Sequence, residues 1–105
     1  MSAKTNEMEK PIRIYIAGKV SGEEENSVFV KFMAAESRLK LDGYDPVNPL
    51  RICSKEWSWQ ECMRHCITAL MTCDAIYMLA DYKGSRGARL EHFIALKMGL
   101  KIINE

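Results

Sequence analysis

The chain has 105 residues, of which 48% are hydrophobic and 28% are charged, and its formal net charge is +1. This length suffices for one domain with one core, and the composition is typical of a soluble globular protein. The near-neutral charge disfavours a nucleic-acid-binding protein, since duplex binders carry a clear basic excess. No apolar run approaches the roughly 18 residues that a membrane helix needs. We therefore expect neither a nucleic acid nor a membrane as a partner.

The first ten residues, MSAKTNEMEK, are polar. We predict that residues 1–10 form a flexible tail and that residues 11–105 form a single α/β domain. Because the tail has no apolar signal core, we expect the protein to be cytoplasmic.

The first half of the domain alternates between strand and helix patterns. Residues 12–17, IRIYIA, are β-branched with a period of two and predict a strand. Residues 24–41 carry apolar side chains at helical spacing and end before a glycine, which predicts a helix. Residues 44–47, YDPV, predict a short strand, which Pro49 prevents from continuing.

The second half repeats this alternation. Residues 58–72 have an apolar stripe at helical spacing and predict a second helix. Residues 74–80, DAIYMLA, are apolar nearly throughout, as expected of a central parallel strand buried on both faces. A third helix is predicted over residues 86–98, and residues 100–103, LKII, predict the last strand.

This order predicts a three-layer, doubly wound parallel sheet of about four to five strands, of the Rossmann or flavodoxin-like class. The strands at 12–17 and 74–80 should lie side by side at its centre. Ligands bind such sheets beyond the carboxyl ends of the strands, where the strand order reverses. Three loops rich in polar, Gly or Pro residues follow strands there, at 18–22, 46–49 and 81–87. We therefore predict a ligand site at this edge, for a molecule such as a sugar phosphate.

The first of these loops, GKVSG, matches neither GxGxxG nor the phosphate-binding GxxxxGK[ST] pattern. However, Gly18 and Gly22 permit close approach of a ligand to the backbone, and Lys19 and Ser21 offer donors for an anion. We predict that these four residues contact the ligand, together with Asn48 of the second loop.

Three further side chains are candidates for the site. Tyr15 lies near the carboxyl end of the first strand, so its hydroxyl could reach the ligand. Ser85 either caps the third helix or contacts the ligand. Glu91 is either a solvated surface carboxylate or a carboxylate beside apolar residues, held ionised by backbone donors near the helix start. In the second case it has the form that nucleophilic attack on an anomeric carbon requires.

The chain has four cysteines, Cys53, Cys62, Cys66 and Cys73. In a cytosolic protein we expect free thiols rather than disulfides. The segment CMRHC could place two thiolates and the imidazole of His65 near one helix face. Zinc sites usually show two short spacings, and a second pair is missing here. We therefore expect these residues to pack within a helix, with neither a metal site nor a cofactor.

Four segments, IYIAGKVSG, GYDPVNP, CDAIYML and SRGARLEH, carry a resemblance to a known superfamily over about residues 11–103. The chain resembles the nucleoside 2-deoxyribosyltransferase-like superfamily, which includes the 2'-deoxynucleoside 5'-phosphate N-hydrolases. It is more similar still to the uncharacterised DUF4406 family. The last segment is the most specific, because a serine, a glycine two residues on and a glutamate six residues on match the superfamily's active-site spacing.

The resemblance implies a role for each of these residues. Glu91 would be the catalytic nucleophile, with Tyr15 beside it, while the loop at 18–22, Ser85 and Gly87 would surround a sugar or its phosphate. It also implies a homodimer or larger homo-oligomer, in which a neighbouring subunit helps to complete the site.

One position departs from the superfamily. Catalytic members carry an aspartate eight residues before the aspartate of the third strand, and this count places Cys66 there, before Asp74. That aspartate handles the proton of the departing base, and a thiol with a pKa of about 8.5 is a poor substitute. Asp81, in the loop after the third strand, is a possible replacement acid.

Three functions are therefore open. The first is an enzyme acting on the N-glycosidic bond of a (deoxy)nucleoside or its 5'-monophosphate, by hydrolysis or base transfer. The second is a catalytically weak or inactive module that binds a nucleotide or ribose phosphate in the same pocket. The third is an interaction protein with Trp57 and Trp59 at an interface. The convergence of the three loops disfavours the third.

Overall fold

The structure is a computed structural model that describes residues 10–105, so nearly all of the predicted tail lies outside the described residues. Within them, the strands form one four-stranded, all-parallel sheet in the order β2-β1-β3-β4. The strands are β1 (Arg13–Ala17), β2 (Asp45–Val47), β3 (Ala75–Met78) and β4 (Lys101–Asn104). The predicted parallel sheet, its strand number and the central pairing of β1 with β3 are confirmed.

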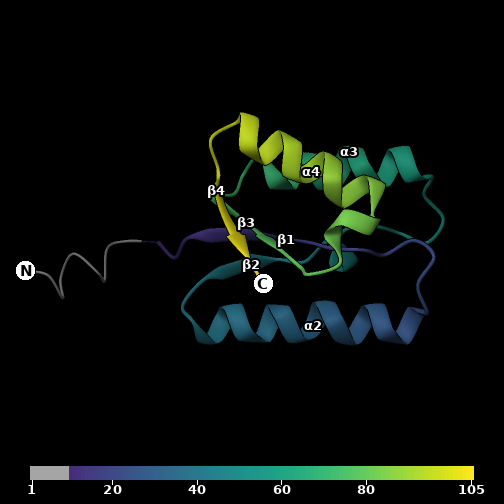
Figure 1. Cartoon of the computed structure of the whole chain (residues 1–105), viewed down its shortest axis with the longest axis horizontal. Helices are drawn as coiled ribbons and strands as arrows, with labels where there is room; N and C mark the ends of the chain where they lie inside the picture. Colours follow the sequence, from purple (N-terminus) through teal and green to yellow (C-terminus); the bar gives the residue numbers. More distant parts are fainter. Residues whose placement is uncertain (1–9) are drawn as a thin grey trace, which may run out of the picture.

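Helices cover both faces of the sheet. They are α2 (Glu25–Leu41), α3 (Trp59–Leu70) and α4 (Arg86–Lys97), with short 3-10 helices η1 (Pro49–Arg51) and η2 (Tyr82–Gly84). Helix α2 lies on one face, and α3 and α4 lie side by side on the other (Figure 1). The three predicted layers are therefore present. None of the helices among residues 10–105 is long and apolar enough to cross a membrane.

Serine side chains fix where α3 and α4 begin. Ser58 Oγ accepts a 3.1 Å hydrogen bond from the Glu61 N–H, and the Glu61 carboxylate accepts one of 2.9 Å from the Ser58 N–H. Ser85 Oγ accepts a 3.1 Å hydrogen bond from the Ala88 N–H. A cap of this kind is worth about 1 kcal/mol. The predicted capping role of Ser85 is confirmed, and the cap holds the start of α4 at the carboxyl edge of the sheet.

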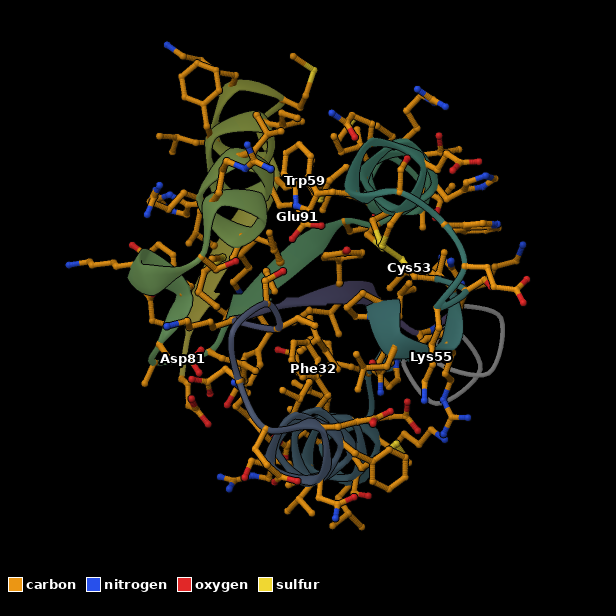
Figure 2. The ribbon with its side chains drawn as sticks, turned by 90° about the vertical axis from the view of Figure 1, so that its right-hand side faces the viewer. Phe32, Cys53, Lys55, Trp59, Asp81 and Glu91 are labelled. Carbon is orange, nitrogen blue, oxygen red and sulfur yellow. A yellow bond between two sulfur atoms is a disulfide. The ribbon has the colours of Figure 1, made fainter. Side chains whose placement is uncertain are left out.

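The alternation of side chains along β1 divides the core in two. Ile14 and Ile16 pack with Phe32 on the α2 face of the sheet, and Figure 2 shows Phe32 between α2 and the strands. Tyr15 points to the opposite face, where it packs with Leu70 and Ile76 beneath α3 and α4. All of these side chains are fully buried. The period-two pattern of the sequence thus places the Tyr15 hydroxyl on the face that carries α4.

Cys53 and Cys62 form a disulfide, so the prediction of free thiols is wrong at these two positions. Cys66 and Cys73 are free thiols, as predicted, and both are buried. Cys53 follows η1 and Cys62 lies in α3, and the chain reverses between them so that their Cα atoms are 5.3 Å apart. This separation is within the range that a disulfide spans. The bond ties the segment after β2 to α3.

Candidate functional site

A pocket of about 240 Å³ opens at the carboxyl edge of the sheet, beside the central strand β1. Residues from all three predicted loops line it, together with side chains of α3 and the first turns of α4. This is the position where the strand order reverses, because β1 has β2 on one side and β3 on the other. A second cavity of about 470 Å³ lies over the start of α2, but Glu91 does not line it.

Glu91 and Tyr15 form the buried polar centre of the first pocket. Only 5% of Glu91 is exposed, and the fully buried Tyr15 hydroxyl donates a 2.5 Å hydrogen bond to its Oε2 atom. Burial raises the pKa of Glu91 to about 7, although the hydrogen bond from Tyr15 opposes this increase. Burial and the neighbouring Glu91 charge also raise the pKa of Tyr15.

Two expectations for Glu91 need correction. It is not a solvated surface carboxylate, and its hydrogen-bond donor is the Tyr15 hydroxyl rather than backbone N–H groups. Glu91 lies in the second turn of α4, where backbone N–H groups already bond within the helix. Burial therefore dominates its pKa, and the group changes from neutral to ionised near neutral pH.

Cys66 lines the same pocket as Glu91. Its side chain is 2% exposed and belongs to the apolar stripe of α3, as the periodicity predicts. Burial raises the pKa of Cys66 to about 11; the Tyr15 hydroxyl opposes the increase and the charge of Glu91 adds to it. The thiol is therefore protonated at neutral pH and supplies no carboxylate-like acid or base.

Four of the predicted ligand contacts line the pocket: Gly18, Ser21, Ser85 and Gly87. At Gly18 the backbone passes so close to Leu79, the residue after β3, that a Cβ atom would lie 2.5 Å from Leu79 Cδ1, so a larger residue there would force the Leu79 side chain to shift. Lys19 and Gly22 do not line the pocket, and Gly22 occupies a turn with a φ of +82°. The first loop therefore reaches the pocket through part of its length only.

Asp81 holds loops together outside the lining of this pocket. Its carboxylate accepts a 3.1 Å hydrogen bond from the Lys19 N–H and a 2.5 Å bond from Lys31 Nζ. Although partial burial acts in the opposite direction, these two bonds lower the pKa of Asp81 overall. Figure 2 shows Asp81 apart from Glu91, toward α2. These contacts fasten the loops after β1 and β3 to α2, and they give no support to Asp81 as a replacement acid.

Asn48 is likewise engaged in the wall of the pocket rather than in its lining. Its Oδ1 atom accepts a 3.0 Å bond from the Leu50 N–H, and its Nδ2 group donates a 3.1 Å bond to Glu36. Arg51 donates bonds of 2.8 and 2.7 Å to the two oxygens of Glu36 and lowers the pKa of that carboxyl to about 2. Glu36 thus clamps η1, which carries Pro49 and Leu50 of the lining. One sequence signal was available, since Glu36 lies four residues after the buried Phe32 in a helical stripe.

Sequence reasoning missed Arg86 and the position of Trp59. The Arg86 guanidinium carbon lies 3.7 Å from the centroid of the Trp59 ring, and both residues line the pocket. Figure 2 shows Trp59 next to Glu91, between α3 and α4. Among the lining residues that the structure describes, Arg86 carries the only positive charge and Glu91 the only carboxylate. The available signal was the place of Arg86 directly after the capping Ser85.

Three cysteine sulfurs meet in the pocket wall. The Sγ atoms of Cys53, Cys62 and Cys66 all lie within 4.8 Å of one another. They are the group of side chains within residues 10–105 whose arrangement could hold a metal ion. His65, from the same CMRHC segment, is not part of this group and instead stacks on Trp57, with ring centroids 4.3 Å apart.

The fold and the pocket define a small α/β protein with one parallel sheet and a cavity at its carboxyl edge. Residues 12–104 match the model of a family described as a domain of unknown function (DUF4406), and the chain belongs to this family. No curated protein matches the chain. The predicted similarity to DUF4406 is thus confirmed.

Proposed function

We propose that the protein cleaves the N-glycosidic bond of a 2-deoxynucleoside or its 5'-monophosphate, with Glu91 as the nucleophile. The observation that carries the proposal is the buried hydrogen-bonded pair of Glu91 and Tyr15. Glu91 is the single carboxylate in the described lining of the pocket, which lies at the expected edge of the sheet. A buried carboxylate with a pKa of about 7 in a cleft is typical of functional sites. The resemblance of SRGARLEH to the superfamily's active-site segment supports the same role.

In the proposed reaction a Glu91 oxygen attacks the anomeric carbon of the sugar. A new carbon–oxygen bond forms while the carbon–nitrogen bond breaks, and the base departs with the bonding electron pair and takes up a proton from solvent water. Water or a second base then displaces Glu91 from the sugar, which gives overall retention of configuration. The Tyr15 hydroxyl holds the carboxylate in position. Deoxyribose is favoured over ribose, because loss of the 2-hydroxyl eases formation of the electron-poor sugar centre.

The start of α4 supplies groups suited to the sugar or its 5'-phosphate. Arg86 places a positive charge in the pocket, and the Ser85 hydroxyl lies at the helix N-terminus. A helix N-terminus and a guanidinium both favour negatively charged oxygens. We therefore assign anion recognition to Arg86 and Ser85, rather than to Lys19, which does not line the pocket.

A second candidate function is a nucleotide- or ribose-phosphate-binding module with weak or no catalysis. The observation that favours it is Cys66, a buried thiol with a pKa of about 11 at the position of the superfamily aspartate. Glycosidic cleavage generally uses a pair of carboxyl groups, one of which handles the proton of the leaving group. With one carboxylate in the described lining, the pocket can bind the same ligand and fail to release its base.

We also propose that the protein works as a homodimer or larger homo-oligomer. Helix α4 exposes a row of apolar side chains at helical spacing, with Leu90 37%, Phe93 55% and Leu96 58% exposed. Burial of this row against a second copy is favourable at about 25 cal/mol for each Å² of apolar surface. Light scattering of the wild type should give a mass of at least two chains. The Phe93→Glu variant should have a mass closer to that of one chain. A wild type that is monomeric at all concentrations would contradict the proposed oligomer.

The two candidate functions separate in one experiment. The protein is incubated with a panel of nucleosides, deoxynucleosides and their 5'-monophosphates, and free base is measured by chromatography while ligand binding is measured by calorimetry. If the protein is an enzyme, the wild type should release free base, and the Glu91→Gln variant should bind the ligand without releasing base. The binding module predicts heat of binding without base release. If no member of the panel binds or reacts, both candidates are wrong.

A further inference from the structure

The sulfur atoms of three cysteines form one compact group in the wall of the pocket. The Cys66 Sγ atom lies 3.5 Å from that of Cys53 and 4.0 Å from that of Cys62. All three residues line the cavity. Figure 2 shows the Cys53 disulfide beside α3, on the inner side of that helix. The fold thus joins two residues of one helix with a third from the segment after η1.

We propose that the reduced protein binds a thiophilic d10 cation, Zn²⁺ or Cu⁺, through Cys53, Cys62 and Cys66. Two thiol molecules of a cellular reductant supply two electrons and two protons, which convert the disulfide into two thiols and form the reductant's own disulfide. The cation then replaces the protons of the three thiols, because thiolates are the metal ligands. Soft sulfur donors select these two ions among the common biological metals.

The sulfur spacing fits such a site. Four-coordinate zinc with Zn–S bonds of about 2.3 Å holds its sulfur ligands about 3.8 Å apart. The two non-bonded separations, 3.5 and 4.0 Å, lie on either side of this value. The third pair is joined by the disulfide, so reduction needs to part these two sulfurs by only a small distance.

Two of the ligands are held by a rigid element. Cys62 and Cys66 are four residues apart in α3, on one face of the helix. Cys53 follows η1, which Glu36 clamps through Arg51 and Asn48. This clamp fastens η1 to α2 without the disulfide, so the segment that carries Cys53 stays in place in the fold after reduction.

The pocket gives access to the remaining coordination position. Because all three cysteines line the cavity, a cation enters from the pocket and keeps one side open to water or to a bound ligand. Three protein ligands with one open position is the pattern of reactive zinc sites rather than of closed structural ones. Glu91 lines the same cavity, so an occupied metal site would alter what binds beside it. The disulfide and the metal compete for the same sulfurs, so occupancy follows the redox state.

Co²⁺ is a suitable probe of the full chain, since cobalt bound by thiolates absorbs strongly in the near ultraviolet. Protein reduced with a phosphine under anaerobic conditions should bind one Co²⁺ per chain, and Zn²⁺ should displace it. Cu⁺, buffered by a competing chelator, is tested in parallel. The oxidised protein should bind at least about 100-fold more weakly, because two of its three ligands are joined to each other. This comparison needs no substitution.

Serine variants identify the ligands. Cys53→Ser, Cys62→Ser and Cys66→Ser should each weaken binding by at least about 100-fold, because each removes one thiolate. Cys73→Ser is the matched control, since its buried thiol contacts the Ala69 carbonyl and lies outside the cluster. Circular dichroism establishes that each variant is folded. The proposal is wrong if the reduced wild type binds none of the three cations, if oxidation leaves binding unchanged, or if Cys73→Ser weakens it as much as Cys66→Ser does.

Discussion

The Tyr15 hydroxyl donates a 2.5 Å hydrogen bond to the Glu91 carboxylate, although the two residues are 76 positions apart in the sequence. The contact exists because β1 is a central strand and α4 crosses the face to which Tyr15 points. Both groups are buried, so removal of either one leaves the other without this hydrogen bond away from water. The pKa of Glu91 and the chemistry proposed for it depend on this pair.

Tyr15→Phe should shift the pH dependence of base release. The Tyr15 hydrogen bond lowers the pKa of Glu91 against the effect of burial, so its removal raises that pKa further above about 7. The acidic limb of the kcat/KM profile should therefore move to higher pH, and the rate should recover in part as the pH rises. Tyr77→Phe, on the α2 face of β3, is the control and should leave the limb in place. A uniform loss of rate at every pH would contradict this role for Tyr15.

Glu91→Gln should stabilise the protein at alkaline pH. The folded-state pKa of Glu91 is about 7 and its ordinary value is 4.5, so the carboxyl favours folding below pH 4.5 and loses this contribution as the pH rises through 7. At about pH 8 the variant should gain roughly 1 to 3 kcal/mol in free energy of unfolding, and at about pH 5 much less. Urea unfolding at both pH values measures this, with the exposed Glu56→Gln as control. An equal effect at the two pH values would contradict the raised pKa.

Glu36→Gln should weaken the clamp on η1. Arg51 lowers the pKa of Glu36 from 4.5 to about 2, so this carboxylate stabilises the fold above pH 4.5 and loses that effect as the pH falls toward 2. We expect a loss of about 1 to 3 kcal/mol in free energy of unfolding at neutral pH, measured by urea, and little loss at about pH 2.5. The exposed Glu25→Gln, whose carboxylate pairs with Lys55, should change stability by less than about 1 kcal/mol. If the two substitutions have equal effects, Glu36 is not a clamp.

Cys66→Asp should increase the rate of base release. An aspartate at this position would supply the acid–base group that the proposed reaction needs for the departing base, and such help is worth about 100- to 10,000-fold. Cys66→Asn has nearly the same shape without the ionisable group and should give no increase. Both variants are compared with the wild type by chromatography of the free base. If the wild type and Cys66→Asp both release no base from any substrate, the binding module is the correct function.

The fold was predictable because its signals are local. The period-two pattern of β1 and the apolar run of β3 mark the two central strands, and glycines or capping serines mark the helix ends. The alternation in β1 also predicts that Tyr15 points away from Ile14 and Ile16 and can reach the site, whereas its place beside Glu91 was expected only from the superfamily resemblance. Strand order then brings the loops to one edge of the sheet.

The use of particular polar and sulfur groups was not predictable. Asn48 and Asp81 have side chains suited to a ligand, but each is engaged by a partner distant in sequence, Glu36 and Lys31. Cys53 lies beside Cys62 and Cys66 because the chain turns back after η1. The spacing of the cysteines in the sequence does not reveal this turn. The expectation of no metal site rested on the absence of a second pair of short spacing, and the fold brings the distant Cys53 beside Cys62 and Cys66.

The covalent state of Glu91 during turnover tests the proposed reaction most directly. The protein is mixed with the deoxynucleoside or monophosphate that releases base, quenched with acid within one turnover, digested and mapped by mass spectrometry. In the wild type, we predict that the peptide containing Glu91 carries one 2-deoxyribosyl group. The Tyr15→Phe variant should carry this group on the same peptide. The Glu91→Gln variant should carry no sugar and release no base. Base release by Glu91→Gln at the wild-type rate, or a sugar attached to a different residue, would contradict the central claim.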